Sequence, residues 1–140
     1  MSYSIKVYIY QTNCDGNVFF RVVEKTIWKN ANGGTWDEVD GYHLLRMGGS
    51  GTCGSLRLLS NTNESYIVTL GVHNHKPWGD ILTDLTSDQT ACVITPGYYG
   101  EGQRAYHLTM YEVANSQGRT CSYQFTVKEG NDLVVRIVIS

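Results

Sequence analysis

The 140-residue chain has no long hydrophobic run, and this absence excludes several classes of protein. No segment approaches the roughly 20 apolar residues that a membrane-spanning helix needs. Residues Met1 to Lys6 do not form the basic and then unbroken apolar stretch of a secretory signal, so we expect a cytoplasmic protein. A formal net charge of −2 gives no excess of basic residues. We therefore expect neither nucleic-acid binding nor membrane insertion.

Cysteine is scarce and lacks the spacing of a disulfide or metal motif. Cys14, Cys53, Cys92 and Cys121 are spread almost evenly, with no C-x-x-C pair, which favours free thiols. The chain also lacks internal repeats, linkers and low-complexity tracts. With 41% hydrophobic and 17% charged residues, the composition is that of an ordinary globular protein, and we expect one domain over residues 1–140.

Motifs for catalysis and metal binding are absent or weak. There is no G-x-S-x-G nucleophile elbow, and the adjacent Asp37 and Glu38 would point to opposite faces of a strand. His73 and His75 are two imidazoles without a third ligand nearby, so loop hydrogen bonds are favoured over zinc, which stays open. We expect a protein that is not an enzyme and needs no cofactor.

One glycine-rich segment matches a nucleotide-binding pattern by its letters alone. Residues 49–54, GSGTCG, fit G-x-G-x-x-G, but a strand-like run follows where a dinucleotide site needs a helix. We interpret the segment as a hairpin loop. Alternatively, its glycines let a ligand approach backbone N–H and C=O groups.

Alternation of apolar and polar residues predicts a protein made mostly of strands. Ile5, Val7 and Ile9 alternate with polar or aromatic neighbours, and Asn32-Gly33 is a strong tight-turn signal. Eight or nine short strands with turns about every ten residues indicate a sandwich of antiparallel sheets. The expected strands are residues 2–10, 19–23, 25–28, 43–47, 55–59, 66–71, 106–113, 120–127 and 133–139.

One segment, residues 78–94, departs from this alternation. Ile81, Leu82 and Leu85 have helical spacing, Asp80 lies where a helix would begin, and Thr86 or Ser87 could cap a second turn before Ala91. We predict a short helical excursion here between two sets of strands.

The aromatic content suggests a ligand. The chain has 10 Tyr and 3 Trp residues, together with loops rich in Gly, Asn, Ser and Thr. Shallow sugar sites combine an aromatic platform with side chains that donate to and accept from hydroxyl groups. On composition alone, ordinary strand tyrosines are the favoured explanation.

Several segments together resemble the fungal fruit-body lectin family. The most specific are ANGGTW at residues 31–36 and MGGSGT at residues 47–52. The remaining matches are residues 7–13, 19–26, 71–74, 98–100 and 129–133, with Lys76, Trp78, Asp80 and Ile81. After His73-Asn74 the family has Tyr-Lys-Arg-Trp-Cys-Asp, whereas this chain has HKPWGD.

The resemblance implies a β-sandwich related to the actinoporins, with a short helix-loop-helix between its two sheets. It also implies a disulfide-free homotetramer that binds glycans of glycoproteins or glycolipids. One implied site takes GalNAc and Galβ1-3GalNAc (the T-antigen disaccharide). Its residues, by motif match, are Ala31, Ser50, Gly51, His73 and Asn74.

A second implied site takes terminal GlcNAc. Its matching residues are Asp80, Ile81, Thr83, Arg104 and Tyr111, and a helix cap is a rival role for Asp80. A defence or storage role follows from the resemblance. The alternative function is a membrane-active, actinoporin-like toxin, which would need an amphipathic N-terminal helix.

Overall fold

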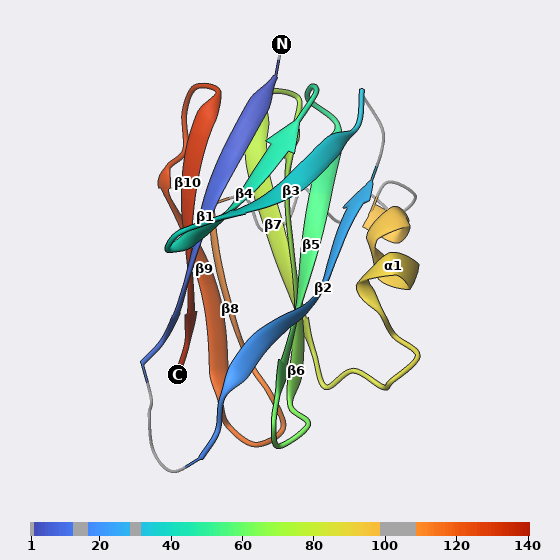
Figure 1. Ribbon diagram of the computed structural model, residues 1–140, viewed down its shortest axis with the longest axis vertical. Coiled ribbons are helices and arrows are strands. Elements are labelled where there is room, and N and C mark those ends of the chain that lie inside the picture. The colour runs from blue at the N-terminus through green and yellow to red at the C-terminus, as the bar shows by residue number, and fades with distance from the viewer. Residues whose placement is uncertain (1, 13–16, 29–31, 99–108) are drawn as a thin grey trace.

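Ten strands form two sheets in the described part of the chain (Figure 1). The structure, a computed structural model, describes residues 2–12, 17–28, 32–98 and 109–140. The six-stranded sheet contains, in spatial order, β3 (Gly34–Val39), β4 (Tyr42–Met47), β1 (Tyr3–Gln11), β10 (Asp132–Ile139), β9 (Thr120–Val127) and β8 (Met110–Ala114). The four-stranded sheet contains β2 (Phe20–Trp28), β5 (Thr52–Ser60), β6 (Ser65–His73) and β7 (Lys76–Thr83). The predicted β-sandwich is confirmed.

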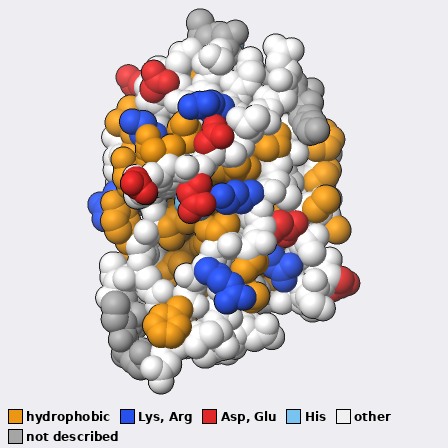
Figure 2. Space-filling view, in the orientation of Figure 1, with side chains coloured by type: hydrophobic (Ala, Val, Ile, Leu, Met, Phe, Trp, Pro, Cys, Tyr) orange, Lys and Arg blue, Asp and Glu red, His pale blue; other side chains and the backbone are white. Residues whose placement is uncertain are grey.

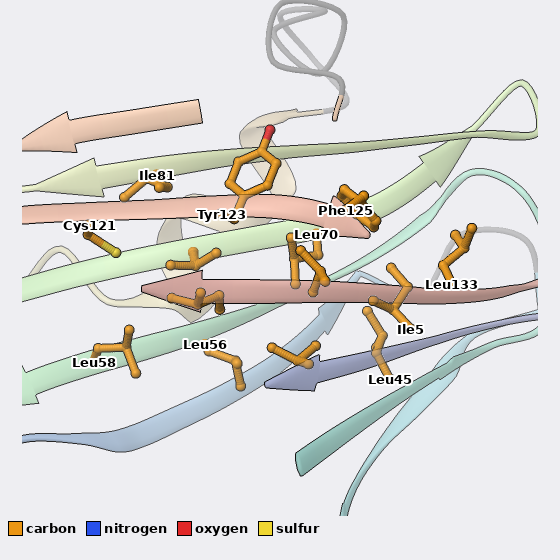
Figure 3. Close-up of a cluster of buried hydrophobic side chains, with 14 of the residues drawn as sticks. Ile5, Leu45, Leu56, Leu58, Leu70, Ile81, Cys121, Tyr123, Phe125 and Leu133 are labelled. Carbon is orange, nitrogen blue, oxygen red and sulfur yellow. The ribbon is translucent and has the colours of Figure 1, made fainter. Parts of the chain in front are cut away.

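The inner faces of the two sheets form the main core (Figure 3). Ile5 and Val7 of β1 are fully buried, while Lys6 between them is exposed, as the alternation predicts. Leu56 and Leu70 enter the same cluster from the four-stranded sheet. Burying one such side chain contributes about 1.5–3 kcal/mol, so this interface is the main source of stability.

The two ends of the chain meet in one pair of strands. β1 and β10 run parallel, with Ile5 opposite Leu133 and Ile9 opposite Ile137. Every other strand pair of the described residues is antiparallel. A parallel pair between sequence-distant strands leaves no local signal, because its register is set by packing rather than by a turn.

The region around Glu24 is one strand with a bulge rather than two short strands. β2 runs from Phe20 to Trp28, and its register against β5 shifts between Val22 and Glu24. The bulge re-aims Glu24, whose carboxylate accepts hydrogen bonds from the N–H groups of Ala91 and Cys92 at 2.8 and 3.0 Å.

The predicted helix around Asp80 is wrong. Lys76–Thr83 forms β7, and the helices that begin and end within the described residues are α1 (Ala91–Ile94) and a 3₁₀ turn at Thr95–Gly97. Trp78 and Asp80 lie under this helical segment, while Ile81 faces the main core. Because both faces of β7 are covered, its apolar residues do not alternate, and the run imitates helical spacing.

The helix cap also comes from elsewhere. Thr90 occupies the N-cap position without a side-chain cap hydrogen bond, and Glu24 of β2 satisfies the first N–H groups of α1. Neither Thr86 nor Ser87 does so. Among the described residues no helix is long and apolar enough to cross a membrane.

Positively and negatively charged side chains both lie on the face shown in Figure 2. Arg46 and Asp37 form an ion pair at 3.3 Å, and Lys25 and Glu38 approach within 3.9 Å. Opposite charges are thus interspersed there, rather than gathered into a patch of one sign.

Candidate functional site

The two most specific sequence motifs contact each other directly. The Gly48 N–H donates a 2.8 Å hydrogen bond to the carbonyl of Gly33. A Cβ atom added at Gly48 would lie only 2.6 Å from the Cβ of Asn32. Asn32 and Gly33 both have positive φ, +70° and +72°, which confirms the predicted turn. The turn is therefore packed onto the glycine-rich loop that precedes β5. This loop connects β4 of one sheet to β5 of the other, so its interpretation as a hairpin loop is wrong.

The glycine-rich loop is joined to the β6–β7 hairpin by two more hydrogen bonds. The Gly51 N–H donates to the carbonyl of Val72 at 2.6 Å, and the His75 N–H donates to Ser50 Oγ at 3.0 Å. Gly51 has a φ angle of +94°, which residues with a Cβ atom rarely adopt. These contacts hold three loops, far apart in the sequence, at one end of the sandwich.

Asn74 and His75 form the two-residue turn of this hairpin. Both have positive φ, +50° and +64°, and the flanking His73 and Lys76 are paired across the strands. This is the geometry of a type I′ turn, which Asn tolerates well. The Asn74 side chain is exposed, and its carboxamide has no hydrogen-bond partner within the part of the chain that the structure describes.

Four of the five residues expected for galactose-type sugars are thus brought together: Ser50, Gly51, His73 and Asn74. Ala31 lies outside the described residues, although its neighbour Asn32 packs against Gly48. The arrangement offers an exposed amide, a hydroxyl and backbone groups around a glycine-lined loop. Such groups can donate to and accept from several sugar hydroxyls at once.

The residues expected for GlcNAc are placed differently. Asp80, Ile81 and Thr83 lie on β7, an edge strand, and Tyr111 lies on β8, the neighbouring edge of the other sheet. Ile81 belongs to the main core and Tyr111 packs against it, whereas Asp80 faces the helical segment. Arg104 lies outside the described residues. The structure therefore brings these positions to one edge but not to one face.

Asp80 is part of a buried polar cluster that sequence reasoning missed. Tyr98 Oη donates to Asp80 Oδ2 at 2.6 Å. Burial, and then the adjacent Asp80 carboxylate, raise the pKa of Tyr98, which keeps its hydroxyl protonated as a donor. Nearby, Ser55 Oγ lies 2.7 Å from the hydroxyls of both Thr69 and Thr95. No sequence signal identifies these partners, because strand pairing and the helical cover bring them together.

Metal binding has little support in the described residues. They contain no group of three or more His, Cys, Asp or Glu side chains able to hold a metal ion. His75 Nδ1 instead lies 2.7 Å from the hydroxyl of Tyr3. This contact fits the favoured interpretation of His75 as a residue that fixes a loop.

Comparisons with known proteins identify the class of this two-sheet sandwich. The family model for fungal fruit body lectins matches residues 1–137. The chain belongs to this family of carbohydrate-binding proteins. Boletus edulis lectin is 46% identical over 144 residues, covering all of both chains. The crystal structure of wild-type Xerocomus chrysenteron lectin is 48% identical, with a TM-score of 0.94 and complete coverage of both chains.

A second crystal structure of Xerocomus chrysenteron lectin, carrying three substitutions, gives the same agreement. It also has a TM-score of 0.94 and 48% identity, over 100% of this chain and 99% of that one. The resemblance stated from the motifs is therefore confirmed, and it extends over the whole fold.

Proposed function

We propose that this lectin binds galactose-type glycans, GalNAc and Galβ1-3GalNAc, through Ala31, Ser50, Gly51, His73 and Asn74. The observation that supports this most is the set of hydrogen bonds that ties three loops together around the unpartnered Asn74 carboxamide. A site held in advance loses little conformational entropy on binding.

Asn74 carries the recognition in this proposal. Its amide donates to one sugar hydroxyl and accepts from the next, while Ser50 Oγ, which accepts from the His75 N–H, still has its own proton to donate. An axial 4-hydroxyl finds a partner among these groups. An epimer that leaves a buried polar group unpaired loses about 1–3 kcal/mol, which would distinguish galactose-type from glucose-type sugars.

The same proposal includes a second site for terminal GlcNAc at the β7–β8 edge, formed by Asp80, Ile81, Thr83, Arg104 and Tyr111. Tyr98 holds one carboxylate oxygen of Asp80, and this fixes the orientation of the group that accepts from sugar hydroxyls. Tyr111 is half-buried and supplies an amphipathic surface.

The protein acts by binding alone, as a single domain over residues 1–140, without a cofactor, and as a homotetramer on glycoproteins or glycolipids. The membrane-active alternative has less support, since it needs an N-terminal amphipathic helix. Residues Tyr3–Gln11 instead form β1, which pairs with β4 on one side and with β10 on the other. The relation to actinoporins, the cytoplasmic location and the defence or storage role stay predictions.

Titration calorimetry tests the proposal with four ligands: Galβ1-3GalNAc, GalNAc, GlcNAc and glucose. We expect saturable binding of the first three, with GlcNAc and GalNAc not competing. A folded protein that binds neither galactose-type sugar at millimolar concentration would overturn the main site. Sedimentation equilibrium on the same sample tests the tetramer.

A further inference from the structure

A pocket of about 360 Å³ lies between the β6–β7 hairpin and the β9–β10 turn. One wall comes from the hairpin, with His75, Lys76 and Pro77, and the opposite wall from the β9–β10 turn, with Lys128 and Glu129. None of these residues was among those expected to bind sugar. The pocket is nevertheless continuous with the proposed galactose-type site, because His75 lines the pocket and its N–H bonds Ser50 Oγ.

Both walls are fixed to the start of β1. Tyr3, itself buried, holds the hairpin wall through its 2.7 Å hydroxyl contact with His75 Nδ1. The carbonyl of Asn131 accepts from the Ser4 N–H at 2.8 Å, and the Asn131 amide donates to the carbonyl of Ser2 at 2.9 Å. The pocket is thus held open between two anchored turns, and a ligand needs to order only the lysine side chains.

The charge of the pocket is opposite to that of the molecule. Among the described residues that line it, Lys76 and Lys128 stand against the single carboxylate of Glu129, while the whole chain carries a net charge of −2. In the described residues neither lysine takes part in an ion pair. Lys25, in contrast, lies 3.9 Å from Glu38. Two unpaired ammonium groups beside a pocket attract an anion, and an ammonium binds carboxylate and sulfate groups alike.

We propose that this pocket is a subsite for an acidic group, carboxylate or sulfate, attached to the glycan held by the neighbouring loops. This deepens the proposed function and rests on it. Lys76 and Lys128 bind the acid from opposite walls, and His75 connects the subsite to Ser50 and Asn74. The HKP sequence at residues 75–77 forms one wall.

The test measures a preference rather than one affinity. The dissociation constant of Galβ1-3GalNAc is divided by that of the same disaccharide carrying a sialic acid, a sulfate, or a neutral fucose. We expect the acidic forms to bind about three- to tenfold more tightly than the neutral disaccharide, as two exposed charge pairs allow. Tighter binding of the sialylated form alone would show that the pocket recognises a carboxylate sugar. Tighter binding of both the sialylated and the sulfated form would show that it recognises negative charge. Fucose should give no gain.

Matched variants locate the effect. Lys76→Gln with Lys128→Gln should abolish the preference, whereas two lysines elsewhere, Lys6→Gln with Lys25→Gln, change net charge equally and should preserve it. The preference should also shrink in 1 M salt, where screening acts over about 3 Å. Melting temperatures confirm that each variant is folded.

Two results would overturn the subsite: equal affinity for neutral and acidic glycans, or a preference that the pocket variants retain. The subsite would also be overturned if the control variant lost the preference for acidic glycans to the same extent, because the preference would then depend only on the net charge of the protein. If the wild-type protein does not bind the neutral disaccharide, the proposed function is wrong. Acidic glycans that still bind in that case would show that the pocket holds an acidic group independently of the proposed function.

Discussion

Tyr98 Oη donates a 2.6 Å hydrogen bond to Asp80 Oδ2 and thereby joins the helical segment to strand β7. Both residues are buried, at 2% and 7% exposure. The contact gives Asp80 two roles, because the residue expected to bind GlcNAc also anchors the only helical cover in the described chain. A substitution of Asp80 would remove the proposed sugar contact and the anchor of the helical segment together, so Tyr98 is the better residue to substitute.

Tyr98→Phe is predicted to weaken GlcNAc binding while sparing galactose-type binding. Losing one donor to a buried carboxylate should cost about 1–3 kcal/mol of unfolding free energy. The carboxylate then loses one of the hydrogen bonds that orient it, and GlcNAc affinity should fall several-fold. Urea unfolding and calorimetry with both sugars check this.

Tyr66→Phe is the matched control. Tyr66 is also buried and donates to the carbonyl of Arg119 at 2.8 Å, so its loss should cost comparable stability. It does not contact Asp80, and GlcNAc affinity should persist. Equal loss of GlcNAc binding in both variants would contradict a positioning role for Tyr98.

Sequence patterns predicted the sandwich where one strand face is buried and the other is exposed. β1, with Ile5 and Val7 inward and Lys6 outward, was found for this reason. β7 was mistaken for a helix because Trp78 and Ile81 are buried on opposite faces. β3 (Gly34–Val39) was missed, since Thr35 and Val39 are exposed and give no clear alternation.

The residues of the candidate site also fall into those that the sequence could predict and those that it could not. Motif letters located Ser50, Gly51, His73 and Asn74, and local turn chemistry supports the conformation of Asn74. The Tyr98 partner of Asp80 and the Glu24 cap of α1 could not be found, because they depend on contacts between residues far apart in the chain. Side-chain types are visible in a sequence, but long-range pairing is not.

Asn74→Gly is predicted to weaken Galβ1-3GalNAc binding by about 1–3 kcal/mol, because paired hydrogen bonds to the sugar are lost. Glycine accepts φ +50°, so the hairpin should keep its shape. Asn74→Ala removes the same amide but adds a left-handed strain of about 1–2 kcal/mol to the fold. Calorimetry and melting curves separate the two. If the glycine variant binds normally, Asn74 is not a sugar ligand.

Cys92 is predicted to be the reactive thiol among the three cysteines that the structure describes. It is exposed, whereas Cys53 and Cys121 are buried, and burial raises the pKa of Cys121 to about 12. Since the thiolate is the nucleophile, Cys92 should react with iodoacetamide at least about a hundredfold faster than Cys121 at pH 8. Peptide mass spectrometry over time measures this. Labelling of Cys121 at the rate of Cys92 would show that the core opens readily.

Glu64 should make stability fall in acid, because it is a buried carboxylate held by three donors. Its Oε1 accepts from Arg119 Nε at 2.7 Å and from Asn115 at 2.8 Å. Oε2 accepts from Thr62 at 2.6 Å. Burial alone would raise the pKa of Glu64, but the hydrogen bonds from Arg119, Thr62 and Asn115 outweigh it and lower the pKa below its ordinary value of 4.5.

A carboxyl group whose pKa is lower in the folded state than in the unfolded state stabilises the folded protein. This stabilisation is complete at pH values above the unfolded-state pKa and is lost as the pH falls through the folded-state pKa. Glu64→Gln should therefore be less stable than wild type at pH 7, by about 1–3 kcal/mol. The difference should narrow as the pH drops below about 4.5. Urea unfolding between pH 7 and pH 3 measures the difference. Glu112→Gln, on the exposed side of β8, should follow the wild-type curve at every pH. A difference between wild type and Glu64→Gln that stays constant with pH would show that the carboxylate is not held in its charged form by these donors.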